Sequence, residues 1–329
     1  MTADITKDTI DLAQPRLGSR VVFATDDFFG AKERLIGPRE PVFKPNKYDE
    51  HGKWMDGWES RRRRDGGHDD AVIRLGVPGL LRGVDIDTRH FTGNYPPEAS
   101  LEGCVSADDL PGDDTEWLTL VPRRGLDGDS RHPIAVEHGN PVTHLRLSIF
   151  PDGGVARLRA YGTVAPDWSR IDLSKRLDLA ALELGGRPVA ANDEHFGRLE
   201  NIIAPGRGRN MGDGWETRRR REPGHDWGVI ALARPGVVEK LVIDTAFFKG
   251  NYPDRCSVQA ALIEGGPADG IAAASADWPL LLPEQKMAAD SEHGFKKELA
   301  DPGPVSHVRL NLFPDGGVSR FRVLGRVAS

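Results

Sequence analysis

The sequence predicts an all-β protein built from two tandem β-sandwich domains. The first observation is a long internal repeat, because Asp-Gly-Trp-Glu-Ser-Arg-Arg-Arg-Arg at 56–64 returns as Asp-Gly-Trp-Glu-Thr-Arg-Arg-Arg-Arg at 213–221, 157 positions later. The second is the high content of glycine and proline, with 38 glycines and 24 prolines in 329 residues. Together the two residue types exceed their usual combined share of roughly 12 %, which is typical of a chain with many tight turns. The third is a period-2 alternation of apolar and polar residues, which indicates strands with one buried face.

The repeat extends over nearly the whole chain, but its offset changes. It is 167 positions at Leu17-Gly18, 157 in the central motifs and 163 at the final strand. The first copy therefore carries about ten additional residues near 37–53, where we expect a longer loop. The additional residues of the second copy fall around 265–302. We predict a first sandwich at 1–164, a connection at 165–178 that extends toward a short helix within 171–184, and a second sandwich at 179–329.

Individual strands follow from the alternation. Residues 72–76 and 81–87 predict two strands, because Pro78-Gly79 lies between them and proline interrupts a strand ladder. Residues 144–149 predict a strand with its leucines on one face. The following Pro-Asp-Gly-Gly at 151–154 predicts a hairpin to a return strand at 157–160. Several short strands joined by such turns favour a sandwich for each copy.

Bulk properties exclude several classes of protein. A net charge of −6 argues against a general nucleic-acid binder, which needs a basic face. No apolar run approaches 18 residues and the N-terminus has no apolar targeting segment. The two cysteines, Cys104 and Cys256, lie outside the repeated motifs and provide no disulfide framework. We expect a cytoplasmic protein without a nucleic-acid or membrane partner.

The repeated arginine motif is the first candidate site. An extended chain places Glu59, Arg61 and Arg63 on one face, with Trp58 and Arg62 on the other. Guanidinium groups bind carboxylates through two parallel hydrogen bonds, so arginines beside a carboxylate indicate a site for a small organic anion. The alternative is a charged edge strand or an ion-pair network between the copies. The matching residues of the second copy are Trp215, Glu216, Arg218, Arg219 and Arg220.

Further polar residues are kept by both copies. A histidine beside an aspartate is suited to proton transfer near neutral pH, although a turn histidine is the equal alternative. An asparagine amide suits urea-like groups, and here the alternative is a purely structural turn. The residues concerned are His68, Asn94, Tyr95 and Asp26 in the first copy and His225, Asn251, Tyr252 and Asp193 in the second. His144 and His307, on the polar face of the final strand, suit a structural role as well as a catalytic one.

Motifs for other chemistries are missing from the sequence. It contains no Gly-x-Ser-x-Gly, no Gly-x-x-x-x-Gly-Lys, no His-Glu-x-x-His and no Cys-x-x-Cys. The serine-nucleophile, nucleotide and zinc-protease classes therefore have no support.

Taken together, these motifs resemble the allantoicase family (allantoate amidinohydrolases) over about residues 12–327, duplication included. The segments that carry the resemblance are Lys53-Trp-Met-Asp-Gly-Trp-Glu-Ser-Arg-Arg-Arg63, Gly67-His-Asp69, Asp87-Thr88, Phe91-Thr-Gly-Asn-Tyr-Pro-Pro97 and Leu145-Arg-Leu-Ser-Ile-Phe-Pro-Asp-Gly-Gly154. The resemblance implies two jelly-roll domains similar to galactose-binding sandwiches. It also implies hydrolysis of allantoate to ureidoglycolate and urea in purine breakdown, a homo-oligomer, and a divalent metal, Mn²⁺, as in some members.

The implied substrate suggests roles for the repeated residues. Allantoate carries one carboxylate and two ureido groups on one carbon, and loss of urea needs an anchor, an acid and a base. Arginines 61–63 or 218–220 would anchor the carboxylate, while His68 or His225 would protonate the leaving nitrogen. Glu59 or Glu216, or else Asp26 or Asp193, would activate water, and Asn94 or Asn251 would hold a ureido oxygen. The alternative is a non-catalytic tandem module that binds a sugar or small carboxylic acid; a further one gives one copy only an assembly role.

Overall fold

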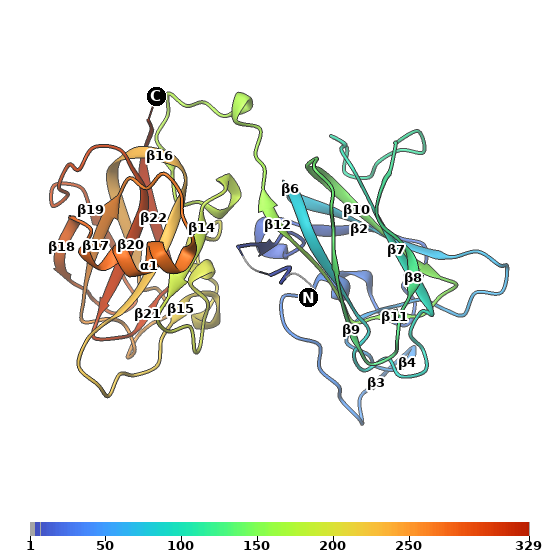
Figure 1. The fold of residues 1–329 in the computed structure, drawn as a ribbon. Coiled ribbons are helices and arrows are strands. Elements are labelled where there is room, and N and C mark those ends of the chain that lie inside the picture. The colour runs from blue at the N-terminus through green and yellow to red at the C-terminus, as the bar shows by residue number, and fades with distance from the viewer. Residues whose placement is uncertain (1–3, 7, 329) are drawn as a thin grey trace. The chain divides into compact units, whose positions relative to one another are not determined.

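The computed structural model describes residues 4–6 and 8–328, which fold almost entirely into β-strands (Figure 1). The described chain divides between Pro166 and Asp167 into two compact units. Each unit contains an eight-stranded antiparallel sheet that curls on itself into a sandwich. The prediction of an all-β chain with two tandem sandwiches is confirmed.

The first unit has its sheet in the order β1-β12-β6-β10-β7-β8, with β2 and β9 also paired to β6. A second, two-stranded sheet joins β11 and β5. The bounds are β1 Ile10–Asp11, β2 Arg20–Ala24, β3 Tyr48–Asp49, β4 Gly52–Lys53, β5 Trp58–Glu59, β6 Asp69–Asp87, β7 Glu98–Cys104, β8 Leu118–Gly125, β9 Arg131–Ala135, β10 Val142–Phe150, β11 Gly154–Val155 and β12 Arg157–Val164. Short 3₁₀ helices are η1 Pro15–Leu17 and η2 Lys32–Ile36.

The second unit repeats this order as β13-β22-β16-β20-β17-β18, with β14 and β19 on β16 and the pair β15-β21. Its strands are β13 Leu177–Asp178, β14 Arg187–Ala191, β15 Trp215–Glu216, β16 Asp226–Asp244, β17 Arg255–Ala261, β18 Leu280–Lys286, β19 Glu292–Phe295, β20 Val305–Phe313, β21 Gly317–Val318 and β22 Arg320–Val327. The helices are η3 Trp168–Arg170, η4 Leu182–Leu184, η5 Leu199–Ile203, η6 Met211–Asp213, α1 Ala268–Ala274 and η7 Ser275–Asp277. Between 171 and 184, where a short helix was expected, the chain forms β13 and η4.

The central strand of each unit is longer than the sequence predicted. Residues 72–76 and 81–87 belong to one continuous strand, β6, and Pro78-Gly79 lies inside it. The N-terminal part of β6 pairs with β2 and β10, whereas the part from Gly79 to Asp87 pairs with β12 and β9. The proline is accommodated because the ladder changes partners at this point, so a missing N–H does not break it.

The predicted hairpin at 151–154 is also wrong. Strands β10 and β12 do not pair with each other, since each pairs with a different part of β6. The Pro-Asp-Gly-Gly segment instead carries the chain from β10 through β11 to β12. Gly154 lies so close to the buried Phe91 that an added Cβ would be 2.0 Å from its ring. This contact explains the glycine at position 154, because the close packing leaves no space for a side chain.

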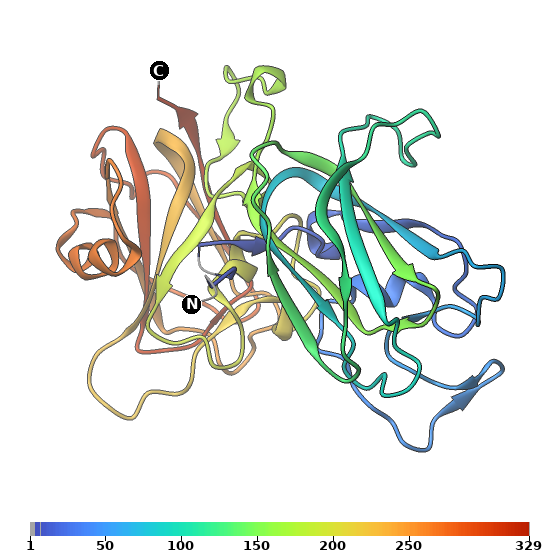
Figure 2. The ribbon, with the colours of Figure 1, turned by 45° about the vertical axis from the view of Figure 1, so that its right-hand side comes forward.

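The two units differ in their additional residues. In the first unit, the 37–53 segment ends in the hairpin β3-β4, which stands out from the strands of its own unit in Figure 2. In the second unit, the additional residues near 265–302 include α1, the one α-helix in the described part of the chain. No described helix has the length and apolar character needed to cross a membrane.

Candidate functional site

A pocket of about 360 Å³ in the first unit contains the best-placed acid of the repeated motifs. Its size is within the range of small-molecule sites. The lining residues come from four places: the loop between β2 and η2, the additional 37–53 segment, the β4–β5 region and the loop after β6. They are Phe29, Phe43, His51, Lys53, Met55, Glu59, His90, Thr92 and Asn94.

Glu59 is positioned by the backbone around it. Strand β5 pairs with β11 on one side, and the N–H groups of Phe29 and Gly30 donate to the Glu59 carbonyl at 3.2 and 3.0 Å on the other. The Glu59 side chain is half-buried and accepts a 2.7 Å hydrogen bond from Asn94 Nδ2. Burial raises the pKa of the Glu59 carboxyl, and the Asn94 hydrogen bond partly opposes that rise. A carboxyl group with a raised pKa in a pocket is suited to proton transfer.

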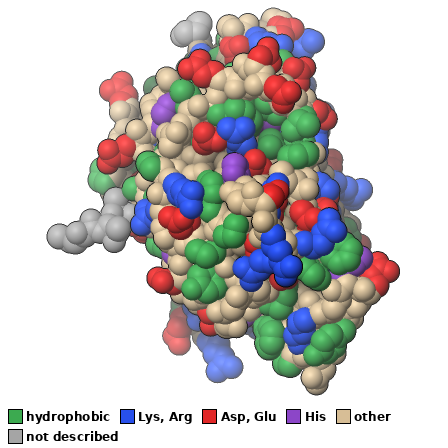
Figure 3. Space-filling model, turned by 90° about the vertical axis from the view of Figure 1, so that its right-hand side faces the viewer, with side chains coloured by type: hydrophobic (Ala, Val, Ile, Leu, Met, Phe, Trp, Pro, Cys, Tyr) green, Lys and Arg blue, Asp and Glu red, His purple; other side chains and the backbone are tan. Residues whose placement is uncertain are grey.

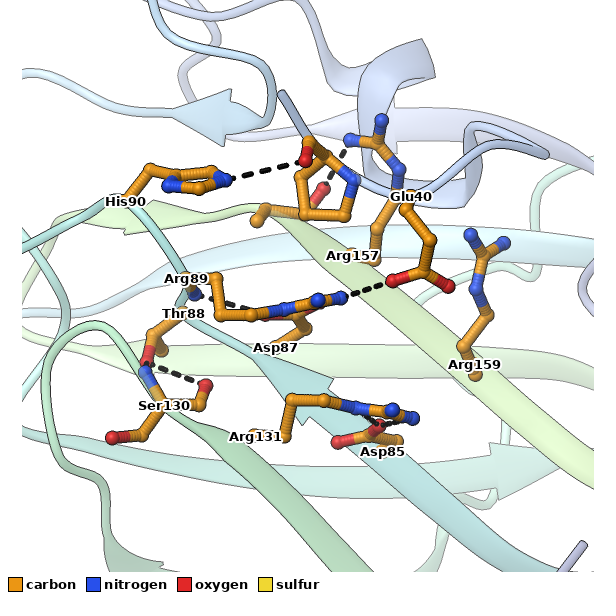
Figure 4. Close-up of polar contacts among 12 residues, drawn as sticks. Glu40, Asp85, Asp87, Thr88, Arg89, His90, Ser130, Arg131, Arg157 and Arg159 are labelled. Atoms are coloured by element: carbon orange, nitrogen blue, oxygen red, sulfur yellow. Dashed lines mark hydrogen bonds and ion pairs between the residues drawn. The ribbon is translucent and has the colours of Figure 1, made fainter. Parts of the chain in front are cut away.

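The 37–53 segment is held against its unit by charged side chains (Figure 4). The Arg89 guanidinium donates hydrogen bonds of 2.6 to 3.0 Å to the Asp87 carboxylate. It also forms an ion pair with Glu40 of the segment. Arg157 Nε donates to the Arg39 carbonyl at 2.9 Å. These contacts hold residues 39 and 40 of the segment against the unit, and the residues that follow line the pocket.

The pocket receives two basic side chains from the far end of the same segment. Lys53 Nζ lies 5.1 Å from the centre of the Phe43 ring and also bonds backbone carbonyls of the loop. The His51 ring lies 4.2 Å from that of Phe28. From the opposite side, His90 Nε2 contacts the Pro41 carbonyl at 3.2 Å. These basic side chains line the same pocket as Glu59 and Asn94, an arrangement that suits a small anion with urea-like groups.

The first arginine of each motif is paired with an aspartate. Arg61 Nε lies 2.7 Å from Asp26 Oδ2, and Arg218 Nε lies 2.8 Å from Asp193 Oδ2. The arginine holds the pKa of Asp26 below its usual value against the opposing effect of burial, and the pKa of Asp193 is lowered in the same way. Both aspartate carboxylates therefore already accept hydrogen bonds from an arginine. None of these four residues lines the Glu59 pocket.

The other arginines lie on the same exposed segment, which is not a strand as expected, because β5 ends at Glu59. Arg63 pairs with buried Asp69 and Arg220 with buried Asp226, each at 2.7 Å. Arg62 lies 3.6 Å from Asp152 and stays 67 % exposed. Residues Arg218 to Arg221 line a separate pocket in the second unit. On the face seen in Figure 3, basic and acidic side chains are mixed rather than gathered into one area.

The aromatic candidates are inside the units. Trp58 and Trp215 are completely buried, and their Nε1 groups donate to the carbonyls of Asp26 and Asp193 at 2.8 Å. They have no exposed surface for a substrate, so they position the aspartates. Tyr95 is partly buried and packs on the cluster around Phe91, and Tyr252 is also partly buried.

The histidines of the Gly-His-Asp motifs lie outside the Glu59 pocket. His68 Nε2 lies 3.4 Å from Asp70, and its ring contacts Phe150. His225 Nε2 lies 3.2 Å from Asn311 Oδ1, and burial lowers its pKa. The structure does not bring them to Glu59 or Glu216.

His144 and His307 are buried, not on an exposed polar face. Burial lowers the pKa of each to about 4, so both are neutral at pH 7. His144 Nδ1 contacts the Thr143 hydroxyl at 2.9 Å, and His307 Nδ1 contacts the Ser306 hydroxyl at the same distance. These contacts favour the structural role.

The pair Glu59–Asn94 has a counterpart in the second unit, where Asn251 Nδ2 donates to Glu216 Oε1. The surroundings differ, because Phe247 replaces His90 and Asn210 replaces Lys53 at the aligned positions. No residue of the second unit corresponds to His51. The acid–amide pair is therefore shared, but the basic residues His51, Lys53 and His90 have no basic counterparts beside it in the second unit.

A divalent metal does not fit the described residues. Within 4–6 and 8–328 no three His, Cys, Asp or Glu side chains are grouped to hold an ion. Glu59 is instead engaged by an amide donor, which a cation would displace. No metal-dependent step is derived for this chain.

Comparison with known proteins identifies the repeat. The family model described as the allantoicase repeat matches residues 10–165 and again 177–328. The chain belongs to the allantoicase family. A protein named probable allantoicase 1 from Burkholderia mallei (strain ATCC 23344) is 55 % identical over 322 residues, which cover 98 % of this chain and 96 % of that protein.

Other allantoicases agree along the full length. A probable allantoicase from Pseudomonas aeruginosa (strain UCBPP-PA14) is 56 % identical over 316 residues, covering 96 % of this chain and 95 % of its own. The crystal structure of allantoicase from Saccharomyces cerevisiae superimposes with a TM-score of 0.83 at 35 % identity, covering 96 % of this chain and 93 % of its own. The jelly-roll duplication is thus the family architecture.

Sequence reasoning missed the residues of the additional segment. Phe43 and His51 have no counterpart in the second copy, so a comparison of the copies passes over them. Lys53 and His90 are replaced by Asn210 and Phe247. The useful signal was the ten-residue difference itself, since long loops often carry function.

Proposed function

We propose that this chain hydrolyses allantoate to ureidoglycolate and urea, and that the reaction takes place in the pocket around Glu59. Membership of the allantoicase family supports the reaction, because the relatives named allantoicase match it from end to end. The single observation that supports the location is Glu59 itself. It is a half-buried carboxyl group with a raised pKa, hydrogen-bonded to an amide, in a small pocket that basic side chains also line.

The groups of the substrate match those of the pocket. As a carboxylate, Glu59 removes a proton from water, whose oxygen replaces one ureido nitrogen on the central carbon. The same carboxyl group then delivers that proton to the departing nitrogen, which leaves as urea. Its raised pKa assists both steps, since the group binds and releases a proton closer to neutral pH. No covalent intermediate is needed.

Two further side chains recognise the rest of the molecule. Lys53 provides the charge for the substrate carboxylate, because its own partners are neutral backbone carbonyls. Arg61 and Arg63 are less suited to this role, since the carboxylates of Asp26 and Asp69 already neutralise them. Asn94 uses its amide to hold a ureido group while it orients Glu59. The exposed Arg62 lies outside the pocket and serves at most to attract the anion to this surface.

The test is release of urea from allantoate by the purified full chain, with and without added Mn²⁺ and with a chelator. Glu59→Gln removes the proton carrier but keeps the size of the side chain, and we expect kcat to fall about 10²- to 10⁴-fold. Glu137→Gln, at an exposed position outside the pocket, is the matched control. No urea under any condition would argue instead for a binding module, and normal turnover by Glu59→Gln would refute this location.

We also propose that the enzyme works in the cytoplasm as a homo-oligomer. Both cysteines are buried free thiols, and burial raises the pKa of Cys104 to about 11, which keeps it protonated and unreactive. Family resemblance supports the oligomer. Cell fractionation and analytical ultracentrifugation test the two statements separately.

A further inference from the structure

The equivalent arginines of the two units, Arg63 and Arg220, have different hydrogen-bond partners. In the first unit the Asp65 carboxylate binds one edge of the Arg63 guanidinium, at 2.8 Å from Nε and 3.1 Å from Nη2. Asp65 is held in place by the Gly67 N–H at 2.9 Å. The other edge of Arg63 binds Asp69. Every side of this guanidinium is therefore matched from within the chain.

In the second unit no carboxylate binds the equivalent edge. Arg220 keeps the contact of its Nη1 with Asp226 at 2.7 Å, and its Nη2 donates to the Pro223 carbonyl at 3.3 Å. Its Nε is buried and makes no hydrogen bond with a described residue. Glu222 stands at the position of Asp65, and no contact joins its carboxylate to Arg220. The following Pro223, where the first unit has Gly66, removes the freedom of the glycine turn that places Asp65.

A pocket of about 440 Å³ is lined in part by Arg220. Its lining combines four arginines and one amide with three carboxylates: Arg218, Arg219, Arg220, Arg221, Asn192, Asp193, Glu222 and Asp226. Asp226 Oδ2 is buried without a hydrogen bond to any described residue. Asp226 itself is 1 % exposed. A buried donor and a buried acceptor without partners are unfavourable unless a further molecule satisfies them.

We propose that this pocket is a second ligand site, for a small carboxylate that also carries an N–H group. Asp65 in the first unit shows the binding mode, since a ligand carboxylate takes the place on Arg220 that the Asp65 carboxylate takes on Arg63. The exposed Arg219 adds positive charge, and the ligand N–H donates to Asp226 Oδ2. An N-carbamoyl acid has this chemistry. The narrower statement that the natural ligand is the substrate or the product rests on the proposed function.

The turn at Glu222–Gly224 controls access. A Cβ added at Gly224 would lie 3.1 Å from Arg220 Nη2, so this exposed turn packs directly on the guanidinium. It must shift for a ligand to reach Nε. The site is separate from the Glu59 pocket, which lies in the other unit.

The two units supply reciprocal variants for a test. The double change Glu222→Asp with Pro223→Gly rebuilds the first unit's turn, so that an internal carboxylate fills the site. Asp65→Ala does the reverse and opens the edge of Arg63. The probe is N-carbamoylglycine, titrated calorimetrically into the full chain, with glycolate (no N–H) and urea (no carboxylate) as controls.

We expect the double variant to lose one site per chain, with binding there weakened about 10- to 100-fold, and Asp65→Ala to gain one. Unchanged site numbers in both variants, or equal binding of glycolate, would overturn the proposal.

Thermal melting checks that each variant is folded, and the gain in Asp65→Ala does not depend on the double variant. The site count does not require turnover, so absence of urea release would count against the proposed function alone. Allantoate titrated into Glu59→Gln, compared with ureidoglycolate, separates substrate from product.

Discussion

At the scale of single residues, the two units show how two substitutions change a charge network while the strand order stays the same. Glu40 of the first unit pairs with Arg89, which binds Asp87. In the second unit Arg207 aligns with Glu40 and lies 4.0 Å from Asp244, while alanine replaces the arginine. The carboxylate at the end of the long strand is thus compensated in both units, from different positions.

Asn94→Ala is expected to change the pH dependence of turnover. The Asn94 amide favours the charged form of Glu59, so its loss raises the Glu59 pKa further above its usual value. Because the carboxylate form is the base, activity is lost as pH falls through this pKa. The acidic limb of kcat/KM should therefore move to higher pH. Asn140→Ala, at an exposed loop position, should leave the limb where it is, and an unmoved limb in Asn94→Ala would show that Glu59 is not the titrating group.

His307→Gln is expected to make the protein less sensitive to acid. The folded pKa of about 4 lies below the unfolded value of about 6.5, so between these values the unfolded chain binds more protons. Stability is therefore lost as pH falls from 6.5 toward 4, by up to about 1.4 kcal/mol per pH unit for one such histidine. Urea denaturation at pH 7 and pH 4.5 measures the effect. The exposed His195→Gln should retain the native loss, and an equal slope in both variants would contradict the assignment.

At the scale of elements, the repeat made the strands and the polar motifs predictable, because both copies keep them at matched spacing. Glu59 and Asn94 were found in this way, and the structure joins them. Strand β6 was divided wrongly because proline normally ends a ladder, and only tertiary pairing shows that the partners change there. Ion pairing of Arg61 and Arg63 was also out of reach, since their partners depend on the folded chain.

Deleting residues 43–52 is expected to damage the site and spare the fold. The deletion joins Val42 to Lys53, as Arg209 is joined to Asn210 in the second unit, which closes its sheet without these residues. The pocket loses Phe43 and His51, so we expect kcat/KM to fall about 10- to 100-fold through a higher KM. Tm should shift by about 4 °C or less, because the segment is mostly exposed. Unchanged kinetics would remove the segment from the site.

Gly154→Ala tests the crossing between β10 and β12. An added methyl group would lie 2.0 Å from the fully buried Phe91 ring, so we expect a loss of about 1–3 kcal/mol from the free energy of unfolding. Gly139→Ala is the control, since nothing lies within 4 Å of its Cβ position. Denaturant unfolding compares the two. Equal stability would mean that the Phe91 loop adapts freely.

At the scale of the whole molecule, duplication has produced two units with one topology and two specialisations. Both keep the acid–amide pair, but only the first surrounds it with the additional segment and its basic side chains. The second has a buried arginine Nε without a hydrogen bond to a described residue, and that arginine lines a pocket of its own unit. Conservation of the fold alone does not account for the different surroundings of Glu59 and Glu216 or of Arg63 and Arg220, because these polar differences lie outside the shared apolar core.

The last prediction follows from this division. If one pocket per chain is complete, Glu59→Gln should reduce urea release about 10²- to 10⁴-fold, whereas Glu216→Gln should retain at least about half of the native rate. Both changes keep side-chain volume and both leave an asparagine partner, Asn94 or Asn251, so the two variants are matched controls for each other. Steady-state urea release at saturating allantoate gives the comparison. Equal halving by the two variants would mean that each unit carries an independent site, and would show that the additional segment is not what makes the Glu59 pocket catalytic.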